Sequence, residues 1–316
     1  MELKALIEIT RPHNCLMGGL TCVIGVFAAD RVFSLNLLGL SARFVGVFPS
    51  RLIEVLTLTY LTYVLIAAAG NVINDIYDVE VDKVNKPNRP LPRGGLTIRQ
   101  AKALTVLLWL VGGISAFATS LIAGIMALVF AALGYVYAAK VKALGAIGNF
   151  AVASSFSFGL FYGAIVAADS RNYFVFLGDN SLIFVPSVIW VYFLTSSFVL
   201  FGREVIKGIE DLRGDRLRSI RTIATVHGAN SASKVAAVSN IVGIISFNMS
   251  WIMDQMKLVM LPLVILGSVA VFVSALLILR SYKKPRNQSK ASLLDKIGGF
   301  CGLAEFLLLN ILFSYV

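Results

Sequence analysis

The residues of this 316-residue chain best suited to chemistry form a stripe of acids and amides at the end of an apolar segment. They lie in the run Asn71-Val-Ile-Asn74-Asp75-Ile-Tyr-Asp78-Val-Glu-Val-Asp82. At about 100° per residue, five of these side chains fall within roughly a quarter to a third of a helix circumference. The five are Asn71, Asn74, Asp75, Asp78 and Asp82. Carboxylate and amide oxygens at this spacing suit a hard divalent cation such as Mg²⁺. The stripe therefore predicts a magnesium site for a phosphate-bearing substrate.

A second acidic run follows a later apolar segment and has the same internal spacing. It contains Glu204, Asp211 and Asp215 at positions i, i+7 and i+11, which are the offsets of three members of the first stripe. Basic residues follow each run, beginning with Lys83 and Arg89 after the first. Two acidic clusters with interspersed Lys and Arg suit a diphosphate whose departure builds negative charge. The alternative is that both runs are solvated helix ends paired with neighbouring charges.

The composition indicates an α-helical integral membrane protein. The chain is 58% hydrophobic and 14% charged, with a mean hydropathy of +0.82, whereas a soluble domain carries roughly a quarter charged residues. Apolar stretches of about 20 residues recur along its length, without the alternation of a membrane β-barrel. We expect one domain, residues 1–316, of nine transmembrane helices. The spans are Cys15–Ala29, Leu52–Asn71, Leu104–Ile122, Ile125–Ala139, Ile147–Ala168, Ile183–Phe201, Val235–Met253, Leu258–Leu279 and Ile297–Val316. The third and fourth spans, and the seventh and eighth, are close enough in sequence to form helical hairpins.

The formal charge of +11 is explained by membrane topology rather than by nucleic-acid binding. With nine spans and a cytoplasmic amino terminus, 23 of the 28 basic residues fall on the cytoplasmic side, as the positive-inside rule requires. Both acidic runs face the same compartment in this arrangement. The three cysteines lie in apolar segments without a CxxC pair, and two histidines are too few to suggest a zinc site.

The two acidic runs resemble the signatures of the UbiA superfamily of membrane prenyltransferases. The first, continuing through Asn85-Lys-Pro-Asn-Arg89-Pro-Leu-Pro-Arg-Gly, is similar to the NDxxDxxxD signature and its loop, and Asp211-Leu-Arg-Gly-Asp215 to the second, DxxxD-type signature. Tyr137-Ala-Ala-Lys140-Val-Lys142 resembles a third family element, a tyrosine–lysine loop.

The resemblance implies a helical bundle around a central cavity with cytoplasmic helical capping loops, and an Mg²⁺-dependent prenyl transfer. The implied metal ligands are Asn71, Asn74, Asp75, Asp78, Asp82, Glu204, Asp211 and Asp215. Among them, Asp78, Asp82, Asp211 and Asp215 are the expected catalytic residues. The expected phosphate-binding residues are Arg11, Lys83, Arg89, Lys140, Lys142 and Lys207. Aromatic side chains that could face a carbocation are Tyr60, Tyr63, Phe156, Phe158, Phe161 and Tyr162.

Within the superfamily, three local features resemble the archaeal subfamily that makes digeranylgeranylglyceryl phosphate. They are Arg11-Pro-His-Asn14-Cys-Leu-Met-Gly, Arg203-Glu-Val-Ile-Lys207-Gly-Ile-Glu-Asp211 and Gly214-Asp215-Arg-Leu-Arg-Ser-Ile-Arg221-Thr. Gly208 departs from the pattern, because that subfamily is expected to carry an acid there. The implied partners are geranylgeranyl diphosphate or a similar prenyl diphosphate, the lipid-phosphate acceptor geranylgeranylglyceryl phosphate, and membrane lipid.

Two alternatives remain open from the sequence. The same site could prenylate an aromatic acceptor, such as 4-hydroxybenzoate or a naphthoate, in quinone synthesis. A cation transporter would also place acids in membrane helices, but it predicts them near the middle of spans.

Overall fold

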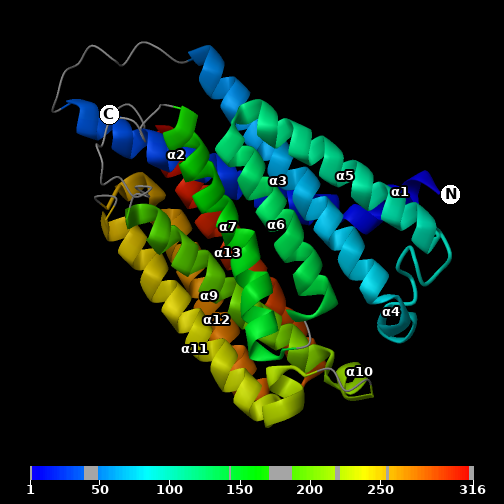
Figure 1. Ribbon diagram of the computed structural model, residues 1–316. Helices are drawn as coiled ribbons and strands as arrows, with labels where there is room; N and C mark the ends of the chain where they lie inside the picture. The colour runs from blue at the N-terminus through cyan, green and yellow to red at the C-terminus, as the bar shows by residue number, and fades with distance from the viewer. Residues whose placement is uncertain are drawn as a thin grey trace. The chain divides into compact units, whose positions relative to one another are not determined.

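The structure is a computed structural model that describes residues 2–38, 49–141, 144–170, 187–217, 221–253 and 256–312. These residues form helices and connecting loops, with no strand among them, which confirms the all-α fold class (Figure 1). The helices are α1 Leu3–Thr10, α2 Pro12–Leu38, α3 Pro49–Tyr77, α4 Val79–Asn85, α5 Ile98–Thr119, α6 Leu121–Ala139, α7 Ala146–Ser170, α9 Ser187–Glu210, α10 Leu212–Leu217, α11 Ile223–Met253, α12 Leu261–Ser281 and α13 Pro285–Leu312. A short 3₁₀ turn, η3 Leu258–Met260, precedes α12.

Eight helical segments in the described part of the chain are long and apolar enough to cross a membrane, and they correspond to the first eight expected spans. They are Pro12–Asp30, Leu52–Tyr77, Ile98–Thr119, Leu121–Ala139, Ala146–Ser170, Ser187–Glu210, Ile223–Met253 and Leu258–Ser281. The ninth expected span falls in α13, which is long but less apolar. Residues 183–186 and 313–316, at the ends of two expected spans, lie outside the described residues.

The first expected hairpin has a tight connection. A single residue, Ser120, joins α5 to α6, and its hydroxyl accepts a hydrogen bond from the Ala123 N–H at 3.1 Å. Helices α11 and α12 pack against each other. At the start of α5, Thr97 and Gln100 form a reciprocal capping box that satisfies two backbone N–H groups.

The chain divides into two compact units. The first comprises Met1–Ala138, Phe158–Ile189 and Leu309–Val316, and the second comprises Ala139–Ser157 and Trp190–Leu308. In the first unit, α3 packs against both α2 and α5 (Figure 1). Glycines bring the backbones of α2 and α7 together: a Cβ on Gly163 would lie 2.0 Å from the Cys22 carbonyl oxygen, and one on Gly25 would lie 2.1 Å from that of Leu160. Small residues allow this approach, which substitutes for hydrophobic driving force between helices in a membrane.

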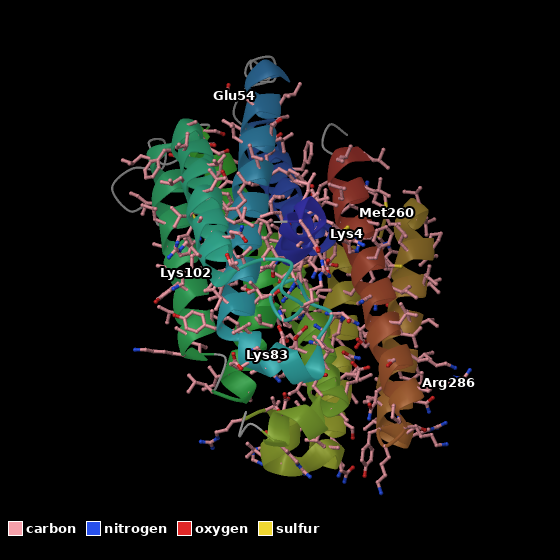
Figure 2. The ribbon with its side chains drawn as sticks, turned by 90° about the vertical axis from the view of Figure 1, so that its right-hand side faces the viewer. Lys4, Glu54, Lys83, Lys102, Met260 and Arg286 are labelled. Carbon is pink, nitrogen blue, oxygen red and sulfur yellow. The ribbon has the colours of Figure 1, made fainter. Side chains whose placement is uncertain are left out.

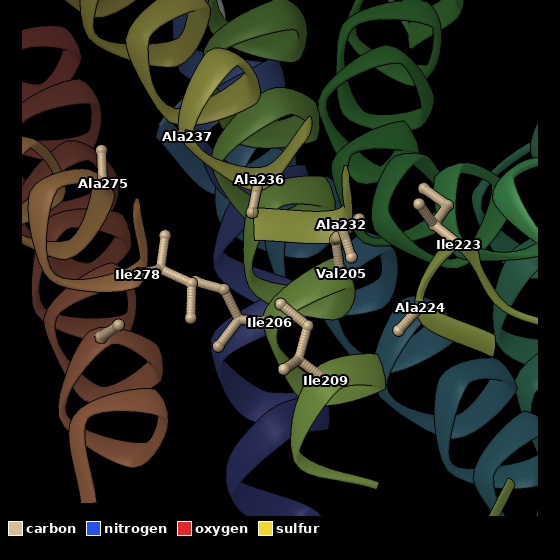
Figure 3. Close-up of a cluster of buried hydrophobic side chains, with 11 residues drawn as sticks. Val205, Ile206, Ile209, Ile223, Ala224, Ala232, Ala236, Ala237, Ala275 and Ile278 are labelled. Carbon is tan, nitrogen blue, oxygen red and sulfur yellow. The ribbon is translucent and has the colours of Figure 1, made fainter. Parts of the chain in front are cut away.

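In the second unit, the core near the acidic run joins α9 to α11, α12 and α13. Val205, Ile206 and Ile209 of α9 pack with Ala236 and Ile278 in a buried cluster (Figure 3). The apolar face of α9 therefore fixes the rotation of this helix, and that rotation determines where the residues of the second acidic run lie.

Candidate active site

The first acidic stripe keeps its helical register across a break between two helices. Helix α3 ends at Tyr77, and Asp78 lies in the turn before α4 with φ −89° and ψ 0°. The Asp78 N–H nevertheless donates to the Asn74 carbonyl at 2.9 Å, and the Asp82 N–H donates to the Asp78 carbonyl at 2.7 Å. The helical spacing of Asn74, Asp78 and Asp82 therefore continues through this turn.

Two acids of this stripe are buried and share one arginine. Asp75 is 4% exposed and Asp82 is 3% exposed. The Arg89 guanidinium pairs with both, at 3.1 Å from Asp75 Oδ1 and in direct contact with Asp82 Oδ2. Arg11 donates to the same Asp75 oxygen from the junction of α1 and α2. The structure thus brings together four predicted site residues in the order Arg11, Asp75, Arg89 and Asp82.

The two asparagines of the stripe differ in their surroundings. Asn74 Oδ1 is buried and has no hydrogen-bond partner in the described part of the chain, so it is an oxygen able to accept from a ligand. Asn71 instead directs its nitrogen to the Thr10 carbonyl at 3.0 Å. Asp78 also interacts with neighbouring groups. Within the described ranges, no three His, Cys, Asp or Glu side chains gather as a metal cluster.

The basic residues near this stripe have different partners. Lys83 pairs with Glu80 at 2.7 Å on the exposed side of α4, away from the buried acids. Figure 2 shows Lys83 beyond one end of α3 and Glu54 near the other end. Arg93, in the loop after α4, pairs with Glu8 at 2.9 Å and with Glu2 at 3.6 Å, and its hydrogen bond to Glu8 raises the pKa of Arg93. The loop is therefore tied to α1 as well as to the stripe.

The second acidic run lies in the other unit and also mixes acids with bases. Glu204 of α9 pairs with Lys207, one turn on, and with Arg203 at 3.3 Å. The Asp211 N–H donates to the Lys207 carbonyl at 2.8 Å, and the Asp215 N–H donates to the Asp211 carbonyl at 3.0 Å. Helical bonding therefore continues from α9 into α10, as it does from α3 into α4. Asp215 is 8% exposed.

The position where an acid was expected, Gly208, has room for a side chain. A Cβ there would lie 3.7 Å from Cβ of Thr222, which is an ordinary contact. Lys140 is exposed just after α6, whereas Lys142 lies outside the described residues.

The structure adds residues that the sequence did not single out. Phe130 of α6 joins the expected aromatic residues, with ring centroids 6.0 Å from Phe158 and 6.3 Å from Tyr162. In the second unit, buried Asn240 donates to Asp295 at 2.9 Å. Asn240 carried a signal in the sequence, since an amide within an apolar span seldom lacks a role.

Comparison with known proteins identifies the family. Residues 32–295 match the UbiA prenyltransferase family. The chain belongs to the UbiA prenyltransferase family. Its relatives include the digeranylgeranylglyceryl phosphate synthase of Saccharolobus solfataricus, which is 34% identical over 98% of this chain and 97% of that protein.

Solved structures show that the UbiA fold extends along the chain. A structure of digeranylgeranylglyceryl phosphate synthase in membranes aligns with a TM-score of 0.69 and 24% identity, over 98% of both chains. A UbiA homologue from Archaeoglobus fulgidus bound to DMAPP and Mg²⁺ aligns with a TM-score of 0.59 and 16% identity, over 95% of this chain and 99% of that one. The family and the helical membrane fold expected from the acidic signatures are confirmed.

Proposed function

We propose that this chain is a digeranylgeranylglyceryl phosphate synthase, a prenyltransferase of archaeal ether-lipid synthesis. It transfers the geranylgeranyl group of geranylgeranyl diphosphate to the free hydroxyl of geranylgeranylglyceryl phosphate. The observation that carries this assignment is the 34% identity to a synthase of that activity across nearly the full length of both proteins. The acids and arginines of the site give the assignment a chemical basis.

The reaction needs a site that holds a diphosphate and promotes its departure. The bond between C1 of the geranylgeranyl group and the diphosphate oxygen breaks, and diphosphate leaves with the electron pair. The acceptor oxygen then forms an ether bond to C1 and loses its proton. The products are digeranylgeranylglyceryl phosphate and diphosphate, and the reaction needs no enzyme nucleophile. Diphosphate or a carboxylate of the stripe takes the proton.

The donor set of the first stripe suits Mg²⁺ in kind. Its residues offer carboxylate and amide oxygens, which are the ligands that a hard cation prefers, and Asn74 Oδ1 is buried without a partner in the described part of the chain. Asn74, Asp75, Asp78 and Asp82 would offer ligands from the first run, and Glu204, Asp211 and Asp215 would offer ligands from the second. Bound there, Mg²⁺ would offset the negative charge of the leaving diphosphate. The homologue from Archaeoglobus fulgidus bound to DMAPP and Mg²⁺ supports this proposal.

The arginines do two things in this proposal. Arg11 and Arg89 neutralise the buried carboxylates of Asp75 and Asp82 before substrate arrives. Because a guanidinium is a fork of donors suited to phosphate oxygens, the same two side chains become phosphate ligands once cations occupy the acids. Lys83, Lys140, Lys142 and Lys207 would add positive charge around the departing diphosphate.

The membrane arrangement completes the proposal. We place α13 as the ninth transmembrane helix, closing a single domain around a central apolar cavity. The cavity keeps water away from the cationic carbon. The amino terminus and the loops after α3 and α9 face the cytoplasm in this arrangement, which leaves the great majority of basic residues on that side.

The test is a transfer assay with purified protein in detergent. We expect radiolabelled geranylgeranyl diphosphate, Mg²⁺ and geranylgeranylglyceryl phosphate to give the digeranylgeranyl ether, identified by mass spectrometry. A chelator should stop the reaction, and added Mg²⁺ should restore it. Prenylation of 4-hydroxybenzoate in preference to the lipid acceptor would assign the chain to quinone synthesis instead.

A matched pair of variants tests the stripe itself. Asp78→Asn removes a stripe carboxylate and should abolish transfer, while Glu80→Gln changes an exposed acid two residues away and should leave turnover near the wild-type value. Equal activity of the two variants would contradict the assignment of the stripe.

A further inference from the structure

The junction between α1 and α2 is an elbow made by Thr10, Arg11 and Pro12. Arg11 is a non-glycine residue in the left-handed region, with φ 51° and ψ 60°. Pro12 contributes no N–H, and the ladder restarts when the N–H groups of Asn14 and Cys15 donate to the Arg11 carbonyl at 3.0 and 3.2 Å. The backbone of the second helix therefore bypasses the Thr10 carbonyl. A partly buried carbonyl in this position needs donors from elsewhere.

Those donors are side chains. Asn71 Nδ2, from α3, donates to the Thr10 carbonyl at 3.0 Å, and Cys15 Sγ donates to the same oxygen at 3.1 Å. Asn71 Nδ2 also lies 3.2 Å from Cys15 Sγ. Only the amide nitrogen of an asparagine can face a carbonyl oxygen as a donor, so this contact fixes the orientation of the Asn71 amide.

The register of α3 connects this contact to the acidic stripe. Asn71 and Asp75 are four residues apart and lie one above the other on α3. Asn71 holds the Thr10 backbone, and Asp75 pairs with the side chain of the next residue, Arg11. The elbow is thus attached to α3 at two points one helical turn apart, and the first attachment determines where the arginine side chain leaves the backbone.

We propose that Asn71 is a positioning residue, which fixes the elbow so that Arg11 reaches Asp75 and the phosphate site, and that it is not a magnesium ligand. The inference rests on the proposed function, because Arg11 is taken to bind a phosphate group there. That phosphate belongs either to the diphosphate donor or to the lipid acceptor, and the KM of each substrate distinguishes the two.

Asn71→Asp separates the two roles because it nearly preserves the shape of the side chain. A carboxylate is a better Mg²⁺ ligand than an amide, so a metal-ligand role predicts that the Mg²⁺ concentration needed for half-maximal activity stays the same or falls. A positioning role predicts weaker substrate binding instead, because the carboxylate has no N–H and repels the Thr10 carbonyl. The KM for one phosphate substrate should then rise about tenfold or more, with little change in the Mg²⁺ requirement.

A second readout does not depend on turnover. Hydrogen–deuterium exchange of residues 3–15, measured without Mg²⁺ or substrate, should be faster in the Asn71→Asp variant than in the wild type because the elbow has lost one attachment. Combining Asn71→Asp with Arg11→Lys should raise the KM less than the product of the single effects, since both changes act through the same guanidinium.

Asn74→Asp is the matched control on the same helix. Asn74 offers a buried oxygen without a hydrogen-bond partner among the described residues, so its replacement should change the Mg²⁺ requirement without faster exchange in residues 3–15. If Asn71→Asp does not fold, Asn71→Ala is measured in the same way, because it removes the donor without adding charge.

The inference is overturned if the Asn71 variant changes the Mg²⁺ requirement while both KM values and the exchange rates stay at wild-type levels. It is also overturned if the Mg²⁺ requirement, both KM values and the exchange rates all stay at wild-type levels. Failure of the proposed function looks different: the wild type itself would then transfer no geranylgeranyl group to the lipid acceptor, whereas the exchange comparison would still report on the elbow.

Discussion

Replacing Arg89 by glutamine should destabilise the protein in a way that Mg²⁺ reverses. Arg89 pairs with Asp75 and Asp82, which are 4% and 3% exposed. Removing one partner of a buried ion pair costs about 3–5 kcal/mol. Asp75 keeps its contact with Arg11, and the Arg89 side chain is 23% exposed, so we expect the loss to be about 2–3 kcal/mol. For a chain of 316 residues, that loss lowers the melting temperature by on the order of 3–5 °C.

The measurement is thermal unfolding of wild type and Arg89→Gln in detergent, with and without Mg²⁺. A cation bound between the uncovered carboxylates replaces the lost positive charge, and at about 100 times its Kd it stabilises the folded state by about 2.7 kcal/mol. Because the Arg89 guanidinium already lies between these carboxylates in the wild type, Mg²⁺ should stabilise the variant more and close most of the gap between the two. Arg93→Gln is the control, because its partners Glu2 and Glu8 are exposed and uncovering them creates no buried cation site.

Two results would refute this reasoning. If Arg89→Gln melts at the wild-type temperature, the bridge between the two acids does not stabilise the fold. If Mg²⁺ raises the melting temperature of Arg89→Gln no more than those of wild type and Arg93→Gln, a cation does not replace the lost Arg89 charge between the two buried acids.

Three further predictions follow from the described geometry. Asp211→Asn should abolish transfer while Glu210→Gln, at the exposed neighbouring position, retains it, and a radiolabel assay that finds both active would exclude the second run from the site. Gly163→Ala should destabilise the protein by about 1–3 kcal/mol because its Cβ would meet the backbone of α2, whereas Gly134→Ala, with nothing within 4 Å, should be neutral or slightly stabilising in thermal unfolding. Gly208→Asp should fold normally and lower the Mg²⁺ concentration needed for half-maximal activity, since it adds a carboxylate at a position where a Cβ makes only an ordinary contact with Thr222; a higher requirement would argue against a metal site there.

Local patterns in the sequence were sufficient for the fold class and for the helical register of both acidic runs. Eight of the nine expected spans correspond to apolar helices because length and hydropathy act over contiguous residues. The register of Asn74, Asp78 and Asp82 was predictable for the same reason, since the backbone hydrogen bonds of the turn continue those of α3.

The partners of the acids could not be predicted in this way. Arg11 meets Asp75 across 64 positions of sequence, and Asn71 meets Thr10 across 61. Such pairs are selected by how α1 and α2 pack on α3, and no spacing rule along the chain contains that information. Lys83 has a local partner instead, because its ammonium group pairs with the exposed acid Glu80 three residues before it; its expected contact with phosphate stays a prediction.

The attachment of α1 to the loop after α4 has a practical consequence for work with the enzyme. Glu2 and Glu8 pair with Arg93, and the Glu2 N–H donates to the Gly95 carbonyl, in the loop that also carries Arg89. We therefore expect a bulky affinity tag or fusion partner ahead of Glu2 to displace this loop and to disturb the pairing of Arg89 with the buried acids. Kinetic constants should therefore be measured after an amino-terminal tag has been removed.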